Sequence, residues 1–120
     1  MSREEVAAAP LRYARQVADR TGATVLLKGS TTLVVPPTSS GLPVRSQCDA
    51  PPWLATAGAG DVLAGLAGTL LASGLDLLDT GSLAALVHGL AGAAARPGGP
   101  VRATGVAHAI PAVVADLLRR

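Results

Sequence analysis

Phenylalanine is absent from this sequence, and all aromatic residues together make up only 2% of its 120 residues. The hydrophobic share is nevertheless 49%, because alanine, leucine and valine dominate. The chain can therefore form a hydrophobic core, but one built mainly from small aliphatic side chains. At this length we expect one small domain rather than two.

Charge is also scarce, at 15% of residues, and the net charge of +2 is too small to favour nucleic acid as a partner. The basic residues are scattered arginines, apart from a single lysine, Lys28. One cysteine, Cys48, allows no internal disulfide, which fits a reducing, cytoplasmic compartment. We expect Cys48 to be a buried thiol rather than a nucleophile.

Long uninterrupted hydrophobic runs are missing as well. The apolar run 62–73 is too short to span a bilayer, and Gly and Thr interrupt it. A secretory signal begins with positive charge and continues with an apolar segment, whereas this sequence has an arginine followed by two glutamates at positions 3–5. We therefore expect no membrane partner and no secretory signal.

The apolar periodicity and the turn residues predict one helix, three strands and then three helices. Ser2 and Glu5 have the spacing of a capping box. The first helix is expected to begin either at this capping box or at Pro10, and to end near Gly22. Strands are expected at 23–28, 31–35 and 42–47, and helices at 60–72, 82–95 and from 106 or 111 to 120. A few strands with about four helices indicate an α/β chain that is part of a larger layered domain.

The most informative stretch is residues 55–65, Ala-Thr-Ala-Gly-Ala-Gly-Asp-Val-Leu-Ala-Gly. Small residues let backbone amides approach a ligand closely, and the first turn of a helix leaves amides unpaired at its positive end. The stretch therefore predicts a phosphate site, with Asp61 placed to act as a base. It is neither a Walker A loop, which needs Gly-Lys-Ser/Thr, nor a dinucleotide fingerprint, since Leu63 stands where Gly or Ala is required. An ordinary helix N-terminus with a favourable acidic residue is the simpler alternative.

Four other side chains carry weaker signals. Lys28 follows a predicted strand, where it could contact a phosphate or lie in solvent. His88 lies in an apolar helix, which favours a hydrogen-bonded core histidine over a ligand. Trp53 is expected to pack against the protein rather than to stack on a base. His108, near the last helix, is expected at the surface.

Three segments carry a family resemblance: Leu27-Lys28-Gly29, the stretch 54–65, and 86–92, which reads Leu-Val-His-Gly-Leu-Ala-Gly. They resemble the ribokinase-like superfamily and, within it, the ADP-dependent NAD(P)H-hydrate dehydratases, which repair hydrated nicotinamide cofactors. The resemblance covers nearly the whole chain but only the C-terminal half of that family's domain. It implies that residues 1–120 form the C-terminal half of a ribokinase-like three-layer α/β domain.

The resemblance also implies a site. The nucleotide phosphates would be lined by Lys28, Gly29, Ser30, Thr31 and Thr32. The anion hole would be formed by Thr56, Gly58, Ala59 and Gly60, and Asp61 would be the catalytic base. Magnesium is expected as a cofactor beside ADP or ATP, since it usually assists phosphoryl transfer, but no residue is assigned to hold it.

The implied reaction is the removal of water from hydrated NAD(P)H, driven by ADP or ATP through a phosphorylated hydroxyl. Two alternatives stay open at this point. One is a ribokinase-like small-molecule kinase, and the other is a non-catalytic remnant that keeps the nucleotide loops. The expected partners are ADP, hydrated NAD(P)H and a second copy of the chain, since unpaired strand edges tend to associate.

Overall fold

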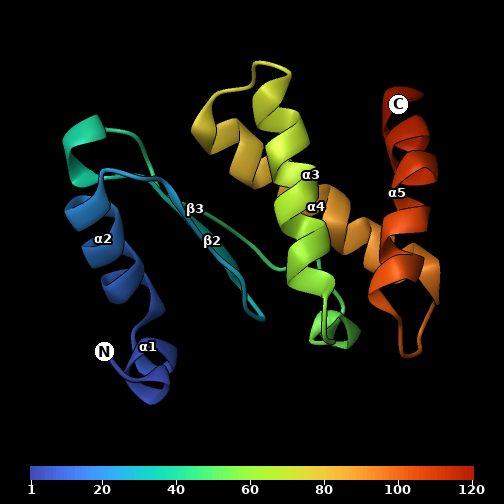
Figure 1. Cartoon of the computed structure of the whole chain (residues 1–120), viewed down its shortest axis with the longest axis horizontal. Coiled ribbons are helices and arrows are strands. Elements are labelled where there is room, and N and C mark those ends of the chain that lie inside the picture. The colour runs from blue at the N-terminus through green and yellow to red at the C-terminus, as the bar shows by residue number, and fades with distance from the viewer. The chain divides into compact units, whose positions relative to one another are not determined.

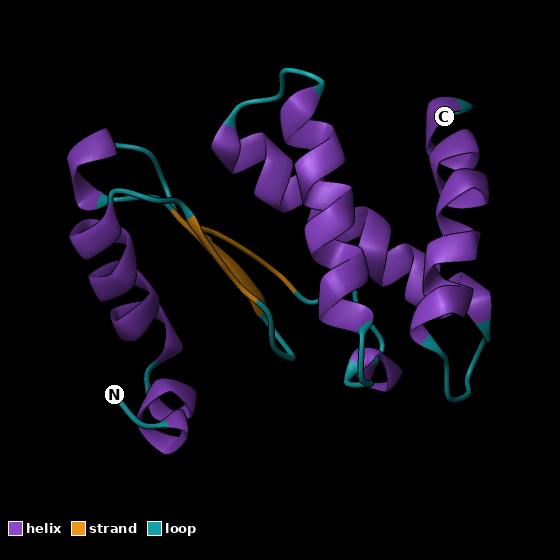
Figure 2. Ribbon diagram, in the orientation of Figure 1, coloured by secondary structure: helices purple, strands orange, loops and turns teal.

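The computed structural model describes all 120 residues, and the chain forms two compact units, Met1–Cys48 and Asp49–Arg120. The first unit combines two α-helices with a small β-sheet, and the second is helical (Figures 1 and 2). No cis peptide bond occurs, and every residue with positive φ is a glycine.

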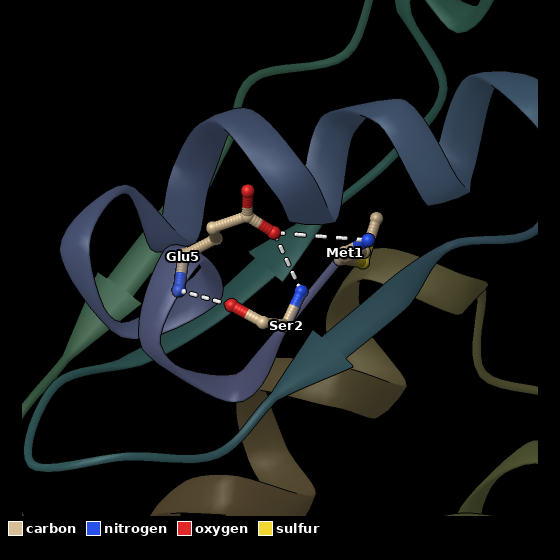
Figure 3. A network of polar contacts seen from close by, with 3 residues as sticks. All are labelled: Met1, Ser2 and Glu5. Atoms are coloured by element: carbon tan, nitrogen blue, oxygen red, sulfur yellow. Dashed lines mark hydrogen bonds and ion pairs between the residues drawn. The ribbon is translucent and has the colours of Figure 1, made fainter.

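The N-terminal helical segment is two helices, α1 (Arg3–Ala8) and α2 (Pro10–Thr21). The predicted capping box is confirmed: Ser2 N donates to Glu5 Oε2 at 2.6 Å, and Glu5 N donates to Ser2 Oγ at 3.1 Å (Figure 3). The break comes at Ala9, whose backbone is not helical, because Pro10 disfavours helical geometry in the residue before it. Proline itself suits the first position of the second helix.

The sheet of the first unit is antiparallel, in the order β1-β2-β3. The strands are β1 (Val25–Leu27), β2 (Thr32–Val35) and β3 (Arg45–Gln47), each shorter than expected but within the predicted segments. Helix α2 packs on β1 and β2, where its small residues Ala14 and Ala18 are buried together with Val34 and Val35 of β2. Alanines on the inner face let the helix lie close to the sheet.

The turn that follows β2 is fastened to α2. Asp19 accepts hydrogen bonds from Thr38 N at 2.6 Å and from Thr38 Oγ1 at 3.0 Å, and Arg15 donates to the Pro36 carbonyl oxygen. The backbone bond from Thr38 is the main reason that the pKa of Asp19 is lowered. These bonds fix where the chain leaves the sheet.

The second unit consists of three helices, α3 (Ala59–Ala72), α4 (Leu77–Ala95) and α5 (Ala103–Leu118), and α4 contacts both others (Figure 1). Its core is made by the following residues: Leu54, Ala59, Val87, Ala91, Val106 and Val113. Close approach depends on Gly92, because a Cβ there would lie 2.7–2.9 Å from the side-chain carbons of Leu54. Because the core has no phenylalanine side chains, its space is filled by chain segments that pack close to the backbone of glycine residues such as Gly92.

Two predicted helix boundaries were wrong. Helix α4 begins at Leu77 rather than at Ser82, because Asp76 caps it by accepting a hydrogen bond from Asp79 N at 2.8 Å. Helix α5 begins at Ala103, ahead of both predicted starts, and Pro111 lies inside it. With α1 separate from α2, the chain has five α-helices rather than about four.

Helix α4 is long and apolar enough to cross a membrane by length and composition, and 56% of its apolar window is buried inside the protein. Core helices of globular proteins pass the same test. In this fold the buried face of α4 lies against α3 and α5.

Candidate functional site

The glycine turn lies where the sequence places it, at the start of α3. Gly58 is the N-cap residue and has φ +86°, in the left-handed region that glycine adopts without a steric penalty. A Cβ on Gly58 would lie 3.1 Å from the Cβ of Ala103, the first residue of α5. The turn therefore requires glycine at this position both for its backbone conformation and for its contact with α5.

The amides of this turn are only partly used. Ala59 N donates to Thr56 O at 3.2 Å, and Asp61 N and Val62 N donate to Gly58 O at 3.1 and 3.2 Å. The amides of Gly58 and Gly60 have no acceptor in the protein. Because a Cβ on Gly60 would meet nothing within 4 Å, there is open space beside this part of the turn. Two unpaired amides at the positive end of a helix can bind an anion.

Asp61 is the third residue of α3 and is exposed. Its carboxylate belongs to the same helical turn as the unpaired amide of Gly60. A carboxylate repels phosphate oxygens, so it contributes little to holding a phosphate. It can instead accept a proton from a hydroxyl group that lies next to the bound anion.

His88 supports this turn from α4. Its Nε2 atom lies 2.9 Å from the carbonyl oxygen of Ala59, and the side chain is 2% exposed. A carbonyl oxygen can only accept a hydrogen bond, so Nε2 carries a proton and donates it. The predicted core histidine is confirmed. The sequence predicts a core histidine because a lone imidazole stands in an apolar helix. Nothing in the sequence predicts that its partner is the Ala59 carbonyl oxygen of the glycine turn.

The residues around Lys28 form the connection between β1 and β2 in the first unit. Lys28 directly follows β1, Gly29 to Thr31 are exposed, and Thr32 is buried as the first residue of β2. Partial burial of the Lys28 ammonium lowers its pKa, because loss of water disfavours the charged form. An anion beside this lysine would favour the charged form again.

The structure thus gathers the predicted site residues into two groups. Lys28, Gly29, Ser30 and Thr31 form one hairpin connection in the first unit, and Thr32 is the strand residue that follows it. Thr56, Gly58, Ala59, Gly60 and Asp61 form the approach to α3 in the second unit. Each group is continuous in sequence and local in structure, which is why sequence motifs could locate it.

A magnesium ion at this site would depend on the phosphates of a bound nucleotide for ligands that the protein does not supply. No group of three or more His, Cys, Asp or Glu side chains is placed to hold a metal ion. Magnesium sites normally use one or two carboxylates together with substrate phosphates. We therefore assign no step of the chemistry to a metal.

Two expectations about single residues were wrong. Cys48 is exposed rather than buried, because it directly follows β3, a strand of largely exposed residues at the edge of the sheet. Trp53 is 47% exposed rather than packed, since the short 3-10 helix Pro52–Leu54 turns Leu54, not Trp53, into the core. His108 is exposed, as expected.

Comparison with known families gives a specific match. A family model described as NAD(P)H-hydrate dehydratase matches residues 5–111. The chain is 49% identical over 86 residues to the bifunctional NAD(P)H-hydrate repair enzyme Nnr of Mycobacterium leprae, covering 70% of this chain and 18% of that protein. It is 46% identical over 70 residues to the ADP-dependent (S)-NAD(P)H-hydrate dehydratase of Neisseria meningitidis, covering 58% of this chain and 23% of that protein.

Among solved structures, YxkO of Bacillus subtilis, a member of the UPF0031 family, matches with a TM-score of 0.83 and 20% sequence identity. The match covers 97% of this chain and 43% of YxkO. It confirms the α/β fold expected from the sequence. The chain spans less than a quarter of the length of both repair enzymes named above.

Proposed function

The chain belongs to the NAD(P)H-hydrate dehydratase family, and we propose that it supplies the nucleotide-phosphate loops and the catalytic base of an ADP-dependent dehydratase acting on hydrated NAD(P)H. The Mycobacterium and Neisseria relatives are named for NAD(P)H-hydrate repair and ADP-dependent dehydration. A compartment that keeps thiols reduced suits the exposed Cys48, so we place this enzyme in the cytoplasm.

One observation carries the proposal: the turn that opens α3 has unpaired amides at Gly58 and Gly60 and a carboxylate at Asp61 within the same few residues. Phosphoryl transfer requires donors for the phosphate oxygens and a group that accepts the proton of the attacking hydroxyl. The turn supplies both. His88, through Ala59, holds the first residue of the helix in place.

The proposed reaction has two steps. Asp61 accepts the proton from the hydroxyl group of the hydrated nicotinamide ring, and the hydroxyl oxygen attacks the terminal phosphorus of ADP. The bond between that phosphorus and its bridging oxygen breaks, and AMP leaves. The carbon–oxygen bond of the new phosphate ester then breaks as the neighbouring carbon loses a proton to water, which yields inorganic phosphate and NAD(P)H.

The Lys28 connection contributes charge and donors in this proposal. The Lys28 ammonium would bind a phosphate oxygen, and the exposed Ser30 and Thr31 would offer hydroxyl groups to others. The amide groups of the glycine turn would bind the phosphoryl group that is transferred. Partial desolvation of Lys28, which lowers its pKa, also strengthens its attraction for an anion.

The test is a titration of the chain with ADP followed by an assay with hydrated NADH. We expect ADP to bind, and we expect NADH and AMP to form together in equal amounts. Formation of NADH without consumption of ADP would contradict the proposed phosphorylated intermediate. Transfer of phosphate to a sugar or vitamin alcohol, with no action on hydrated NADH, would identify a small-molecule kinase instead.

A further inference from the structure

A pocket lies in the helical unit, between the end of α4 and the start of α5. Its volume is about 600 Å³. The side chains that matter are Arg96, directly after α4, and Arg102, Thr104 and His108 at the start of α5. None of these residues belongs to the glycine turn or to the Lys28 connection.

The lining of this pocket is basic. It includes two arginines and a histidine, and no acidic residue. The side chains of Arg96 and Arg102 make no ion pair or hydrogen bond within the protein. The arginines at the other end of α5 differ, since Arg119 and Arg120 both pair with Asp116, at 3.6 and 3.1 Å. The pocket therefore carries guanidinium groups whose donors are unused.

The backbone of α5 adds donors to the same pocket. Arg102 is the N-cap residue and makes no side-chain cap, and the first turn contains no acidic residue. The first amide of α5 with an acceptor is that of Val106, which donates to Arg102 O at 3.1 Å. The preceding amides, including those of Thr104 and Gly105 in the pocket lining, have no acceptor. Helices α1 and α4, by contrast, are capped by Ser2 and Asp76.

We propose that this pocket binds a phosphate monoester, with Arg96 and Arg102 as the charged ligands and the first turn of α5 as the backbone ligand. A doubly charged phosphate matches planar guanidinium donors, which bind two of its oxygens at once. The pocket is larger than a phosphate group alone requires, so it has room for the organic part of the ester. The site is separate in its residues from the proposed dehydratase site.

Two nucleotide phosphates share this chemistry: the 2′-phosphate of NADP(H) and the 5′-phosphate of AMP. The test therefore compares matched ligand pairs on the full chain by calorimetry. NADP⁺ is compared with NAD⁺, which lacks the monoester, and AMP is compared with adenosine. Inorganic phosphate is a further probe for the anion alone.

We expect Arg96→Ala with Arg102→Ala to weaken binding of at least one monoester about tenfold or more. Binding of the ligand that lacks the monoester should not change. The control is Arg119→Ala with Arg120→Ala, which removes the same charge from the other end of α5 and should leave all affinities as they were. Thermal melting should show the same folding for both double variants, since all four side chains are exposed.

The pair that responds identifies the source of the phosphate: NADP⁺ or AMP. Equal losses in both double variants would mean that net charge, not the pocket, attracts the ligand, and would overturn the proposal. Unchanged monoester affinity in Arg96→Ala with Arg102→Ala would overturn it too. Loss of ADP-dependent turnover in Asp61 or Lys28 variants does not bear on this site, so the two proposals fail separately.

Discussion

His88 Nε2 donates a hydrogen bond to the carbonyl oxygen of Ala59 at 2.9 Å, which ties the middle of α4 to the first residue of α3. Both residues are buried, with exposed fractions of 2% and 0%. The turn that presents the unpaired amides is thus fixed on its inner side by a single imidazole. In the proposed enzyme His88 is a positioning residue, because it acts through Ala59 and not on the ligand.

Replacing His88 with leucine should lower the free energy of unfolding by about 1–3 kcal/mol, because the buried Ala59 carbonyl loses a donor. Nucleotide binding should weaken as the first turn of α3 loosens. His88→Gln, whose amide can donate to the same oxygen, should recover part of both losses. Chemical denaturation and ADP titration measure the two effects. Wild-type ADP affinity in His88→Leu would show that the bond stabilises the core without positioning the turn.

Substitution of Gly58 by alanine should destabilise the protein by about 1–2 kcal/mol, because φ at this position is +86° and a side chain there is strained. The added Cβ would also press against Ala103. Gly60→Ala is the matched control, since its Cβ would meet nothing within 4 Å and alanine is a better helix residue than glycine. Thermal melting of the two variants should move in opposite directions. Equal melting temperatures would remove the requirement for glycine at position 58.

Lys28→Ala should weaken ADP binding by about one to two decades, the loss expected for a charge-assisted hydrogen bond of about 1.5–3 kcal/mol. The melting temperature of the free protein should change little, since partial burial disfavours the charged form of the ammonium group. Calorimetric titration of both proteins measures the difference. Equal affinities would place Lys28 outside the nucleotide site.

The same lysine predicts a pH dependence. The phosphate binds the protonated amine, so ADP affinity should fall as pH rises through the pKa of Lys28. Because burial holds that pKa below the usual 10.5, the fall should begin at a lower pH than for a fully solvated lysine. Lys28→Arg keeps its charge across this range and should flatten the profile. A profile that is the same in both proteins would contradict the assignment.

The features that the sequence predicts best are those that depend on a few consecutive residues. The capping box of Ser2 and Glu5 and the helix that follows Gly58 were both predicted, since each rests on local backbone chemistry. The same holds for the strands before Lys28 and after Thr31.

What the sequence could not show depends on residues far apart in the chain. The donor role of His88 requires α4 to cross α3, and the pocket at Arg96 and Arg102 requires the end of α4 to meet the start of α5. Helix α4 begins earlier than the sequence predicts because Asp76 caps it. Trp53 is exposed because the neighbouring Leu54, and not Trp53, fills the space over Gly92.

The most direct test of the proposed chemistry is Asp61→Asn, with turnover of hydrated NADH and ADP affinity measured on the same preparation. Removing a general base should lower kcat by about 10²–10⁴-fold, while ADP affinity stays the same or rises because a negative charge beside the phosphates is lost. An ordinary acidic residue in the first turn of a helix would instead contribute only about 0.3–1 kcal/mol of stability. In that case kcat would be close to normal, and this result would contradict the account.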